Sequence, residues 1–338
     1  MKNFSKKLFV IFVTIFLCFN AVACNPNNPN EPATPINPPQ PPTETTSRIN
    51  YVSLGDSIAD GSGLADYQSK DSLGFVNGSY AQLFKQKLEQ DYDEVNAVNY
   101  GKSGDDSNDL LMFLTSLFSD NLSELKQSIK TNIQLADIIT VCIGANDILS
   151  PATSQMGNFL IFNKEVTSHL DSGIQQLKNN FPQIINKLKI LNSSANIIFL
   201  NVYNPYKELA TTPNNMPTIS GPLSIDSNKL KEIGIITESY LIAGELNLSS
   251  VSKTIIDGVN TIIKSNIENV SNYHLLDVKA AFDNYLSVNA TYDIVNVNLL
   301  SQSSVNTSTL NQYLDPHPNA KGHELIYSLL STLADAFN

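Results

Sequence analysis

The chain has 338 residues and a formal net charge of −11, with 32 acidic against 21 basic side chains. This length allows one large domain or two small ones, each with a sizeable hydrophobic core. The negative charge disfavours nucleic acid as a partner and electrostatic adhesion to anionic lipid, because both of those surfaces are themselves negative.

The first 23 residues have the pattern of an export signal. Three lysines precede the apolar stretch from Leu8 to Phe19, which is too short to span a bilayer comfortably. The sequence AVAC at 21–24 then resembles the lipobox of bacterial lipoproteins, whose cysteine receives a diacylglyceryl group. This resemblance implies an exported lipoprotein anchored through Cys24 to the outer face of the cell membrane. The alternative is a secretory signal cleaved near Ala23, which would give a secreted protein.

Residues 24–47 have the composition of a tether. After Cys24 they are rich in proline and asparagine and almost devoid of large apolar side chains, so they cannot bury a core. Prolines make such a segment semi-rigid. We therefore divide the chain into a signal peptide (1–23), a lipidated tether (24–47) and one globular domain (48–338).

From Arg48 onward, short apolar runs alternate with amphipathic helical patterns. The strand candidates are 51–54, 95–99, 138–143, 197–202 and 273–278. The helix candidates are 80–92, 110–117, 158–191, 228–266 and 325–337. This βαβ alternation predicts an α/β fold with a parallel sheet that helices cover on both faces.

The first strand runs directly into a Gly-Asp-Ser turn at 55–57. Gly55 permits a sharp exit from the strand and leaves Ser57 at its carboxyl end, where ligands of open α/β sheets bind. Such a tripeptide is by itself usually only a turn. The interpretation of Ser57 therefore depends on the loops that follow later strands.

Three later loops carry suitable chemistry. Gly104, after the strand 95–99, would let a backbone N–H approach a ligand closely. Asn146, after the strand 138–143, has a side-chain amide that can donate to a developing oxyanion. His317 lies between two prolines just before the last helix, and an imidazole held in this way can serve as general base to a serine.

Together Ser57, Gly104, Asn146 and His317 resemble, in residue type and order, the GDSL esterases and lipases, also called SGNH hydrolases. The resemblance covers most of 48–338 and implies a flavodoxin-like three-layer α/β/α sandwich. It also implies that Ser57 is the nucleophile and His317 the base. The oxyanion hole would consist of the Ser57 and Gly104 backbone N–H groups and the Asn146 side chain. Water would complete hydrolysis of the acyl-enzyme, so no cofactor and no metal is implied.

One position departs from the pattern of that family. The family usually carries an aspartate three residues before the histidine, where this chain has Leu314. Asp315, two residues before His317, is our candidate for orienting the imidazole. The alternative is a Ser-His dyad in which a backbone carbonyl holds His317.

The resemblance implies an ester substrate and leaves its class open. Lipid or simple small-molecule acyl esters are one possibility, and O-acetyl groups on polysaccharides are another. A catalytically inactive surface module that binds carbohydrate or lipid is a third interpretation. The proline-rich loop 204–226 either borders the substrate cleft or is a plain surface insertion.

Several other polar residues have simpler explanations. Asp56 and Asp147 are expected to fix turn or helix-start geometry through backbone hydrogen bonds. His323, at the start of the last helix, is expected to make a local structural contact. Cys142 lies inside an apolar run, which is typical of a buried small residue and not of a nucleophile.

Overall fold

The computed structural model of this chain describes residues 46–148, 164–208, 218–220, 248–289, 291–306 and 312–337. By its contacts the chain divides into two units, 1–45 and 46–338, and all of the described residues belong to the second. The expected signal peptide, Cys24 and nearly all of the tether lie outside the described residues. So do most of the loop 204–226 and the first part of the helix expected from residue 228.

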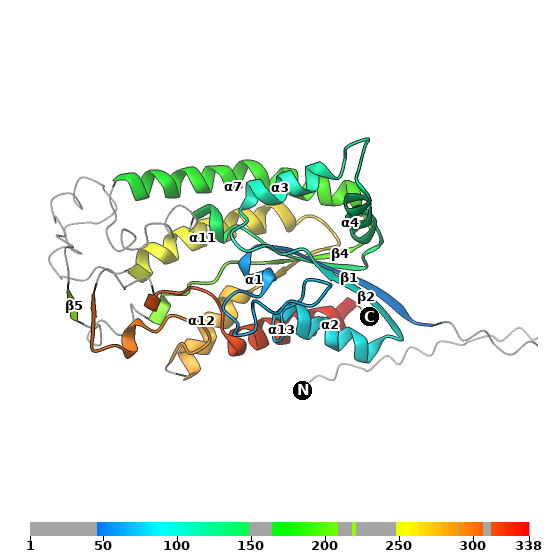
Figure 1. Ribbon diagram of the computed structural model, residues 1–338. Helices are drawn as coiled ribbons and strands as arrows, with labels where there is room; N and C mark the ends of the chain where they lie inside the picture. The colour runs from blue at the N-terminus through cyan, green and yellow to red at the C-terminus, as the bar shows by residue number, and fades with distance from the viewer. Residues whose placement is uncertain are drawn as a thin grey trace, which may run out of the picture. The chain divides into compact units, whose positions relative to one another are not determined.

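A five-stranded parallel sheet forms the centre of the second unit (Figure 1). Its strands are β1 (Arg48–Gly55), β2 (Glu94–Asn99), β3 (Ile138–Cys142), β4 (Asn196–Leu200) and β6 (Tyr273–Leu276). All five expected strands are therefore present. Their order in space is β2-β1-β3-β4-β6, so the direction of winding reverses beside β1.

The sheet buries both of its faces, as β1 illustrates. Val52 and Leu54 belong to one hydrophobic core, whereas Ile49 and Tyr51 belong to the other. This division arises because successive side chains of a strand point to opposite faces of the sheet. The sheet is consequently the middle layer of three.

Two groups of helices supply the outer layers (Figure 1). The first core includes side chains from α3 (Ser107–Ser116), α4 (Glu124–Leu135), α7 (Lys164–Leu191) and α11 (Leu248–Ile267). The second includes side chains from α2 (Tyr80–Asp91), α12 (Val278–Asn289) and α13 (Ala320–Ala334). The α/β/α sandwich expected from the sequence is thus confirmed.

The sequence did not predict every element. The additional ones include α1 (Ser57–Asp60), α4, α12, the 3-10 turn η2 (Leu299–Ser301) and a short parallel pair, β5 (Thr218–Ser220) with β7 (Ser304–Asn306). The helix expected over 325–337 is α13 followed by a 3-10 turn, η4 (Asp335–Phe337). The helix α1 and the turn η2 have too few residues to show a clear hydrophobic period. The helices α4 and α12 have 12 residues each and were missed in spite of their length. Of the additional elements, α1 matters most, because it begins at Ser57.

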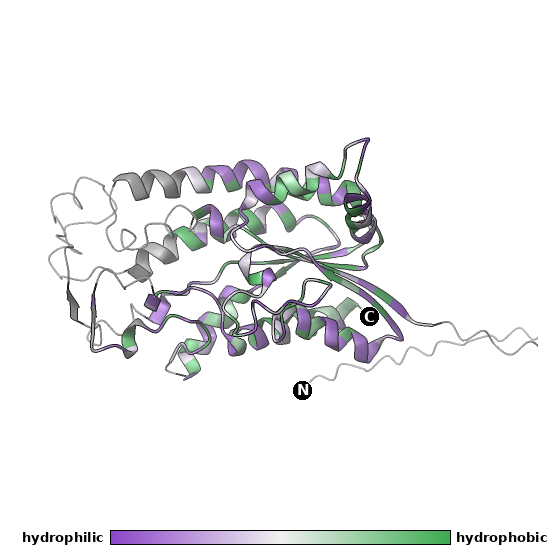
Figure 2. Cartoon of the chain, in the orientation of Figure 1, coloured by the Kyte–Doolittle hydropathy of each residue, from purple (hydrophilic) through white to green (hydrophobic). Residues whose placement is uncertain are grey.

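Hydrophobic residues follow the strands, while hydrophilic residues occupy much of α2 and the outer side of α7 (Figure 2). This is the usual distribution for helices that pack one side against a sheet. Within the described part of the chain, no helix has both the length and the apolar character needed to cross a membrane.

Gly55 is the residue at the end of β1 where the backbone leaves no room for a side chain. Its φ is +134°, and a Cβ placed there would lie 2.0 Å from the Cys142 carbonyl oxygen on β3. We expect Gly55→Ala to lower the free energy of unfolding by more than about 2 kcal/mol, since strain and a backbone clash combine. Urea unfolding of the purified protein measures this change.

The matched control is Gly258→Ala in α11. A Cβ at Gly258 meets no atom within 4 Å. This substitution should raise the free energy of unfolding by up to about 1 kcal/mol, because alanine is the better helix residue. Equal effects of the two substitutions would contradict the steric account of Gly55.

Candidate active site

The strand order brings three of the predicted site residues to one edge of the sheet. Ser57 follows β1, which lies between β2 and β3. Gly104 comes after β2 on one side, and Asn146 comes after β3 on the other. The carboxyl ends of parallel strands share an edge, and ligands of this fold class bind where the winding reverses.

Ser57 is the first residue of α1 and is 8% exposed. The Asp56 side chain caps this helix by accepting a hydrogen bond from the Ile58 N–H at 3.0 Å. The Asp56 N–H donates to the Cys142 carbonyl at 2.9 Å, and Gly61, with φ of +84°, ends the helix after one turn. The structural role expected for Asp56 is confirmed, and it holds the backbone of Ser57 against β3.

Hydrogen bonds hold the loop that carries Gly104 at the residue before it and at the residue after it. The Ser103 N–H donates to Asp60 Oδ2 of α1 at 3.0 Å. The Asn146 amide nitrogen donates to the Asp105 carbonyl at 2.9 Å. An amide nitrogen carries two hydrogens, so this bond orients the Asn146 side chain and leaves a second hydrogen for another acceptor. Gly104 itself has φ of +90°.

Asp60 is a residue of this site that the sequence interpretation missed. It is 2% exposed and accepts hydrogen bonds from the Tyr67 hydroxyl at 2.8 Å and the Ser103 N–H at 3.0 Å. It also pairs with Lys70. Buried carboxylates require such partners. The available signal was an acidic residue three positions after Ser57, with a tyrosine and a lysine shortly beyond it.

Asp147 holds the same region from the β3 side. Its carboxylate accepts from the backbone N–H of Ser107 at 2.9 Å and from the Ser107 hydroxyl. Burial raises the pKa of Asp147 to about 6. Since Ser107 begins α3, Asp147 determines where that helix starts relative to β3, which confirms its expected role in helix-start geometry.

His317 and Asp315 are in direct contact. His317 Nδ1 lies 2.6 Å from Asp315 Oδ1, and the His317 backbone N–H donates to the same oxygen at 3.1 Å. Burial favours a higher pKa for Asp315, but the hydrogen bonds from His317 outweigh it and hold the pKa below the usual value. An ionised carboxylate only accepts, so Nδ1 carries the hydrogen and Nε2 is the basic nitrogen.

The loop of His317 packs beside the segment that follows α1. A Cβ added at Gly63 would lie 2.6 Å from the Cβ of His317. Asn296 joins the two segments, since its side chain donates to the Gly63 carbonyl and its backbone N–H donates to the His317 carbonyl, both at 2.9 Å.

Cys142 takes the buried position expected of it, and His323 is structural as expected, although its contact is with a residue 243 positions away and not local. His323 is fully buried, and its Nδ1 accepts from the Tyr80 N–H at 3.2 Å. Burial lowers the pKa of His323 to about 4, so the ring is neutral. Burial beside Asp56 raises the pKa of the Cys142 thiol, which makes it a poor nucleophile. Among the residues the structure describes, no three His, Cys, Asp or Glu side chains are grouped as metal ligands would be.

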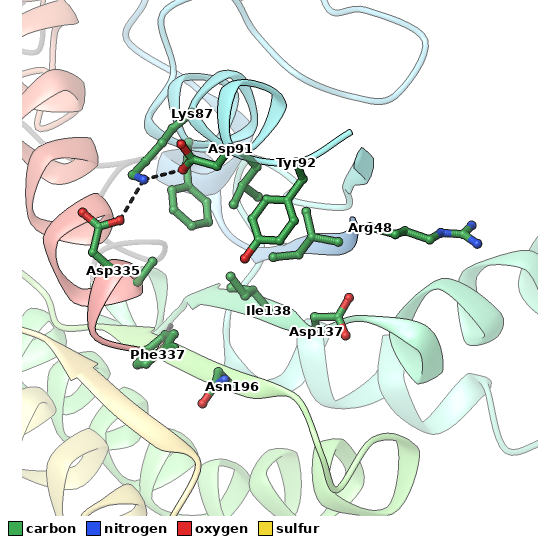
Figure 3. Close-up of a pocket in the computed structure, with 13 residues that line it drawn as sticks. Arg48, Lys87, Asp91, Tyr92, Asp137, Ile138, Asn196, Asp335 and Phe337 are labelled. Atoms are coloured by element: carbon green, nitrogen blue, oxygen red, sulfur yellow. Dashed lines mark hydrogen bonds and ion pairs between the residues drawn. The ribbon is translucent and has the colours of Figure 1, made fainter. Parts of the chain in front are cut away.

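A separate pocket of about 230 Å³ lies at the opposite edge of the sheet, where the strands begin (Figure 3). Arg48 and Ile138, the first residues of β1 and β3, contribute to its lining. At its rim Lys87 pairs with Asp91 at 2.6 Å and with Asp335 at 2.8 Å (Figure 3). This pocket contains none of the predicted site residues.

The strand order and the position of these loops define a doubly wound α/β protein with its candidate site at the reversal beside β1. The sequence model of one family, described as GDSL-like Lipase/Acylhydrolase, matches residues 51–330. The chain therefore belongs to the GDSL-like lipase and acylhydrolase family, as its motifs indicated.

Individual relatives are more distant. The chain is 27% identical over 163 residues to the uncharacterized protein YpmR of Bacillus subtilis (strain 168), an alignment that covers 48% of this chain and 54% of that protein. The chain thus spans about half the length of this curated relative.

Two solved structures resemble the fold. Phospholipase A1 from Streptomyces albidoflavus NA297 has a TM-score of 0.50 and 15% identity, with 85% of this chain and 99% of that chain covered. An extracellular lipase from Streptomyces rimosus has a TM-score of 0.49 and 16% identity, with 84% and 99% covered. At such identities, the phospholipase supports the fold assignment alone.

Burial of Asp56 makes stability depend on pH. Burial raises the pKa of its carboxyl to about 7, so the folded protein keeps a proton that the unfolded chain releases near pH 4. Stability from this group therefore falls as the pH rises through that window. Asp56→Asn keeps an N-cap side chain but does not titrate. As the pH rises from 4 to 7, we expect its free energy of unfolding to increase relative to that of the native protein by up to about 4 kcal/mol.

Urea unfolding at several pH values measures that difference. The comparison with native protein is needed because the lowered pKa of His323 makes its own contribution rise with pH. Asp120→Asn, at an exposed carboxyl, is the control and should follow the native curve. If Asp56→Asn also runs parallel to the native curve, Asp56 is not the protonated group.

Proposed function

We propose that this protein is a serine hydrolase that cleaves carboxylic esters through an acyl-enzyme on Ser57. The observation that carries the proposal is the 2.6 Å contact between His317 Nδ1 and Asp315. This contact lies in a loop that packs against the segment following Ser57. An oriented imidazole near a serine at the carboxyl end of a strand is the arrangement that nucleophilic acyl transfer requires.

In the first half of the reaction, Ser57 Oγ attacks the ester carbonyl carbon and His317 Nε2 takes the hydroxyl proton. Asp315 keeps the ring in the required tautomer and stabilises the imidazolium. The carbon–oxygen bond to the alcohol then breaks, and His317 returns the proton to the leaving alcohol. The acyl group is left as an ester on Ser57.

In the second half, water replaces the alcohol. His317 takes a proton from the water, whose oxygen attacks the acyl carbon, and Ser57 leaves with the proton returned by His317. The products are a carboxylic acid and free enzyme.

Three hydrogen-bond donors would stabilise the oxyanion in both halves. As the first residue of α1, Ser57 has a backbone N–H without an acceptor inside the helix. The Gly104 N–H and the second amide hydrogen of Asn146 are the other two. Each such donor is worth about 3 to 4 kcal/mol of barrier in serine hydrolases. The bonds of Ser103 and Asp105 to α1 and Asn146 support this assignment, because they hold the donors in place before substrate arrives.

Substitution of the nucleophile and of its supporting acid tests the proposal. We expect Ser57→Ala to lower kcat for p-nitrophenyl esters by roughly 10⁶-fold. Asp315→Asn should cost roughly 10⁴-fold if Asp315 supports the imidazole. A loss below about tenfold would instead indicate a Ser-His dyad. Asn146→Ala should cost roughly 10² to 10³-fold in kcat.

The controls are Ser69→Ala and Asn108→Ala, which should keep native activity. Ser69 is an exposed serine on the loop after α1, and Asn108 is an exposed asparagine of α3. Substrates of short and long acyl chain, with an acetylated sugar beside them, separate lipid and simple esters from O-acetyl groups. A native protein that turns over none of these, and whose Ser57 resists a fluorophosphonate probe, would instead be an inactive binding module.

We also propose that the domain acts outside the cell while anchored through Cys24. Support comes from the lysine-rich start, the short apolar stretch and the AVAC sequence. Mass spectrometry of the mature N-terminus from membrane fractions should find Cys24 as the first residue, carrying a diacylglyceryl group. An unmodified N-terminus recovered only from the medium would contradict the anchor.

A further inference from the structure

The backbone around Asp315 is held by two buried tyrosines from another part of the chain. The Tyr203 hydroxyl donates to the Pro316 carbonyl at 2.5 Å. The Tyr206 hydroxyl donates to the Leu314 carbonyl at 3.1 Å. These carbonyls belong to the residues on either side of Asp315, so the two tyrosines hydrogen-bond the backbone immediately before and after it.

The burial of the side chains indicates whether the tyrosines position the loop of Asp315 or the loop positions the tyrosines. The side chains of Asp315 and His317 are 40% and 28% exposed, so packing alone does not fix them. Tyr203 and Tyr206 are only 4% and 3% exposed. A tyrosine hydroxyl buried to this extent needs an acceptor, and losing it costs free energy. The rigid partner is therefore the tyrosine segment that follows β4.

The tyrosine segment is itself well anchored. The Tyr206 N–H donates to Asn204 Oδ1 at 3.0 Å, and the Tyr292 hydroxyl donates to the Asn204 carbonyl at 2.9 Å. The Tyr203 ring packs on Phe282 of α12, with ring centroids 4.4 Å apart. The segment therefore links the loop of His317 to β4, which it follows in the chain, and to α12, on which it packs.

Leu314 explains why the acid lies at an unusual position. It occupies the place three residues before His317, yet it is 3% exposed and belongs to the hydrophobic core on one face of the sheet. A carboxylate there would be buried among apolar side chains at a large cost. Asp315 is the next residue, and its side chain contacts the imidazole instead.

We propose that Tyr203 and Tyr206 are positioning residues that fix the backbone of 314–316, so that a carboxylate two residues before His317 holds the imidazole. The kinetic consequence rests on the proposed esterase function. The structural consequence, a formed hydrogen bond between His317 Nδ1 and Asp315, does not.

The test uses Tyr203→Phe, Tyr206→Phe and the double variant, each of which keeps the ring and removes the hydroxyl. We expect each single change to lower kcat for p-nitrophenyl acetate by about tenfold and the double change by about a hundredfold, the scale of one and two lost hydrogen bonds. KM should stay within about twofold, because the hydroxyls act on the base and not on substrate binding. Tyr285→Phe, whose hydroxyl bonds to Asp293 on the exposed surface, is the matched control.

A double-mutant cycle separates positioning from general stability. In the Asp315→Asn background the tyrosine substitutions should lower kcat no further, because the group they position is already absent. The proton NMR spectrum gives an independent readout, since the hydrogen between His317 Nδ1 and Asp315 should resonate far downfield in native protein and Tyr285→Phe. That signal should weaken or vanish in the double variant. Urea unfolding identifies any variant that does not fold, in which case the single variants decide.

The possible outcomes distinguish this inference from the proposed function. Native kcat and an unchanged downfield signal in the double variant would overturn the inference, as would equal losses with and without Asp315. A native protein with the signal but no hydrolysis, and loss of the signal in the double variant, would support the positioning role and overturn the esterase proposal. Absence of both signal and hydrolysis from native protein would overturn both.

Discussion

The hydrogen bond from the Asp56 N–H to the Cys142 carbonyl is the contact on which the candidate site depends. It joins the turn after β1 to the end of β3, and it forms because Gly55 brings the two backbones close enough. A side chain at Gly55 would push the strands apart at the point where the sheet must present Ser57. The turn, the one-turn helix α1 and the position of Ser57 all follow from this close approach.

Buried carboxylates then join the loops to one another. Asp60 extends from α1 to the segment before Gly104, and Asp147 connects the end of β3 with the start of α3. Both acids accept backbone N–H groups, so they hold main-chain geometry and not merely side chains. Donors that are fixed in this way before substrate arrives need little rearrangement when negative charge develops, which is the physical basis of oxyanion stabilisation.

Buried residues also contact the loop that carries His317, the proposed base. The half-buried pair Asp315 and His317 lies in a loop that contacts the interior through the core residue Leu314 and through hydrogen bonds from the buried tyrosines at 203 and 206. A site can thus remain open to substrate while its geometry is determined in the interior. The departure from the usual spacing of the family is therefore a change of loop path, with Asp315 still in contact with the ring.

The sequence by itself predicted the five strands and the class of fold, because hydrophobic period and strand-end glycines are local features. It also supplied Ser57, Gly104, Asn146 and His317 as candidate site residues. It did not reveal the tyrosines at 203 and 206, whose partners lie 113 and 108 residues away along the chain. It also did not reveal Asp60, whose bond to the Ser103 N–H spans 43 residues. Nor did it decide between a carboxylate and a backbone carbonyl as the support of His317. The tertiary structure shows that His317 Nδ1 contacts the Asp315 carboxylate. Residue spacing does not reveal this contact, because the path of a loop depends on burial such as that of Leu314 and on hydrogen bonds from residues distant in the sequence.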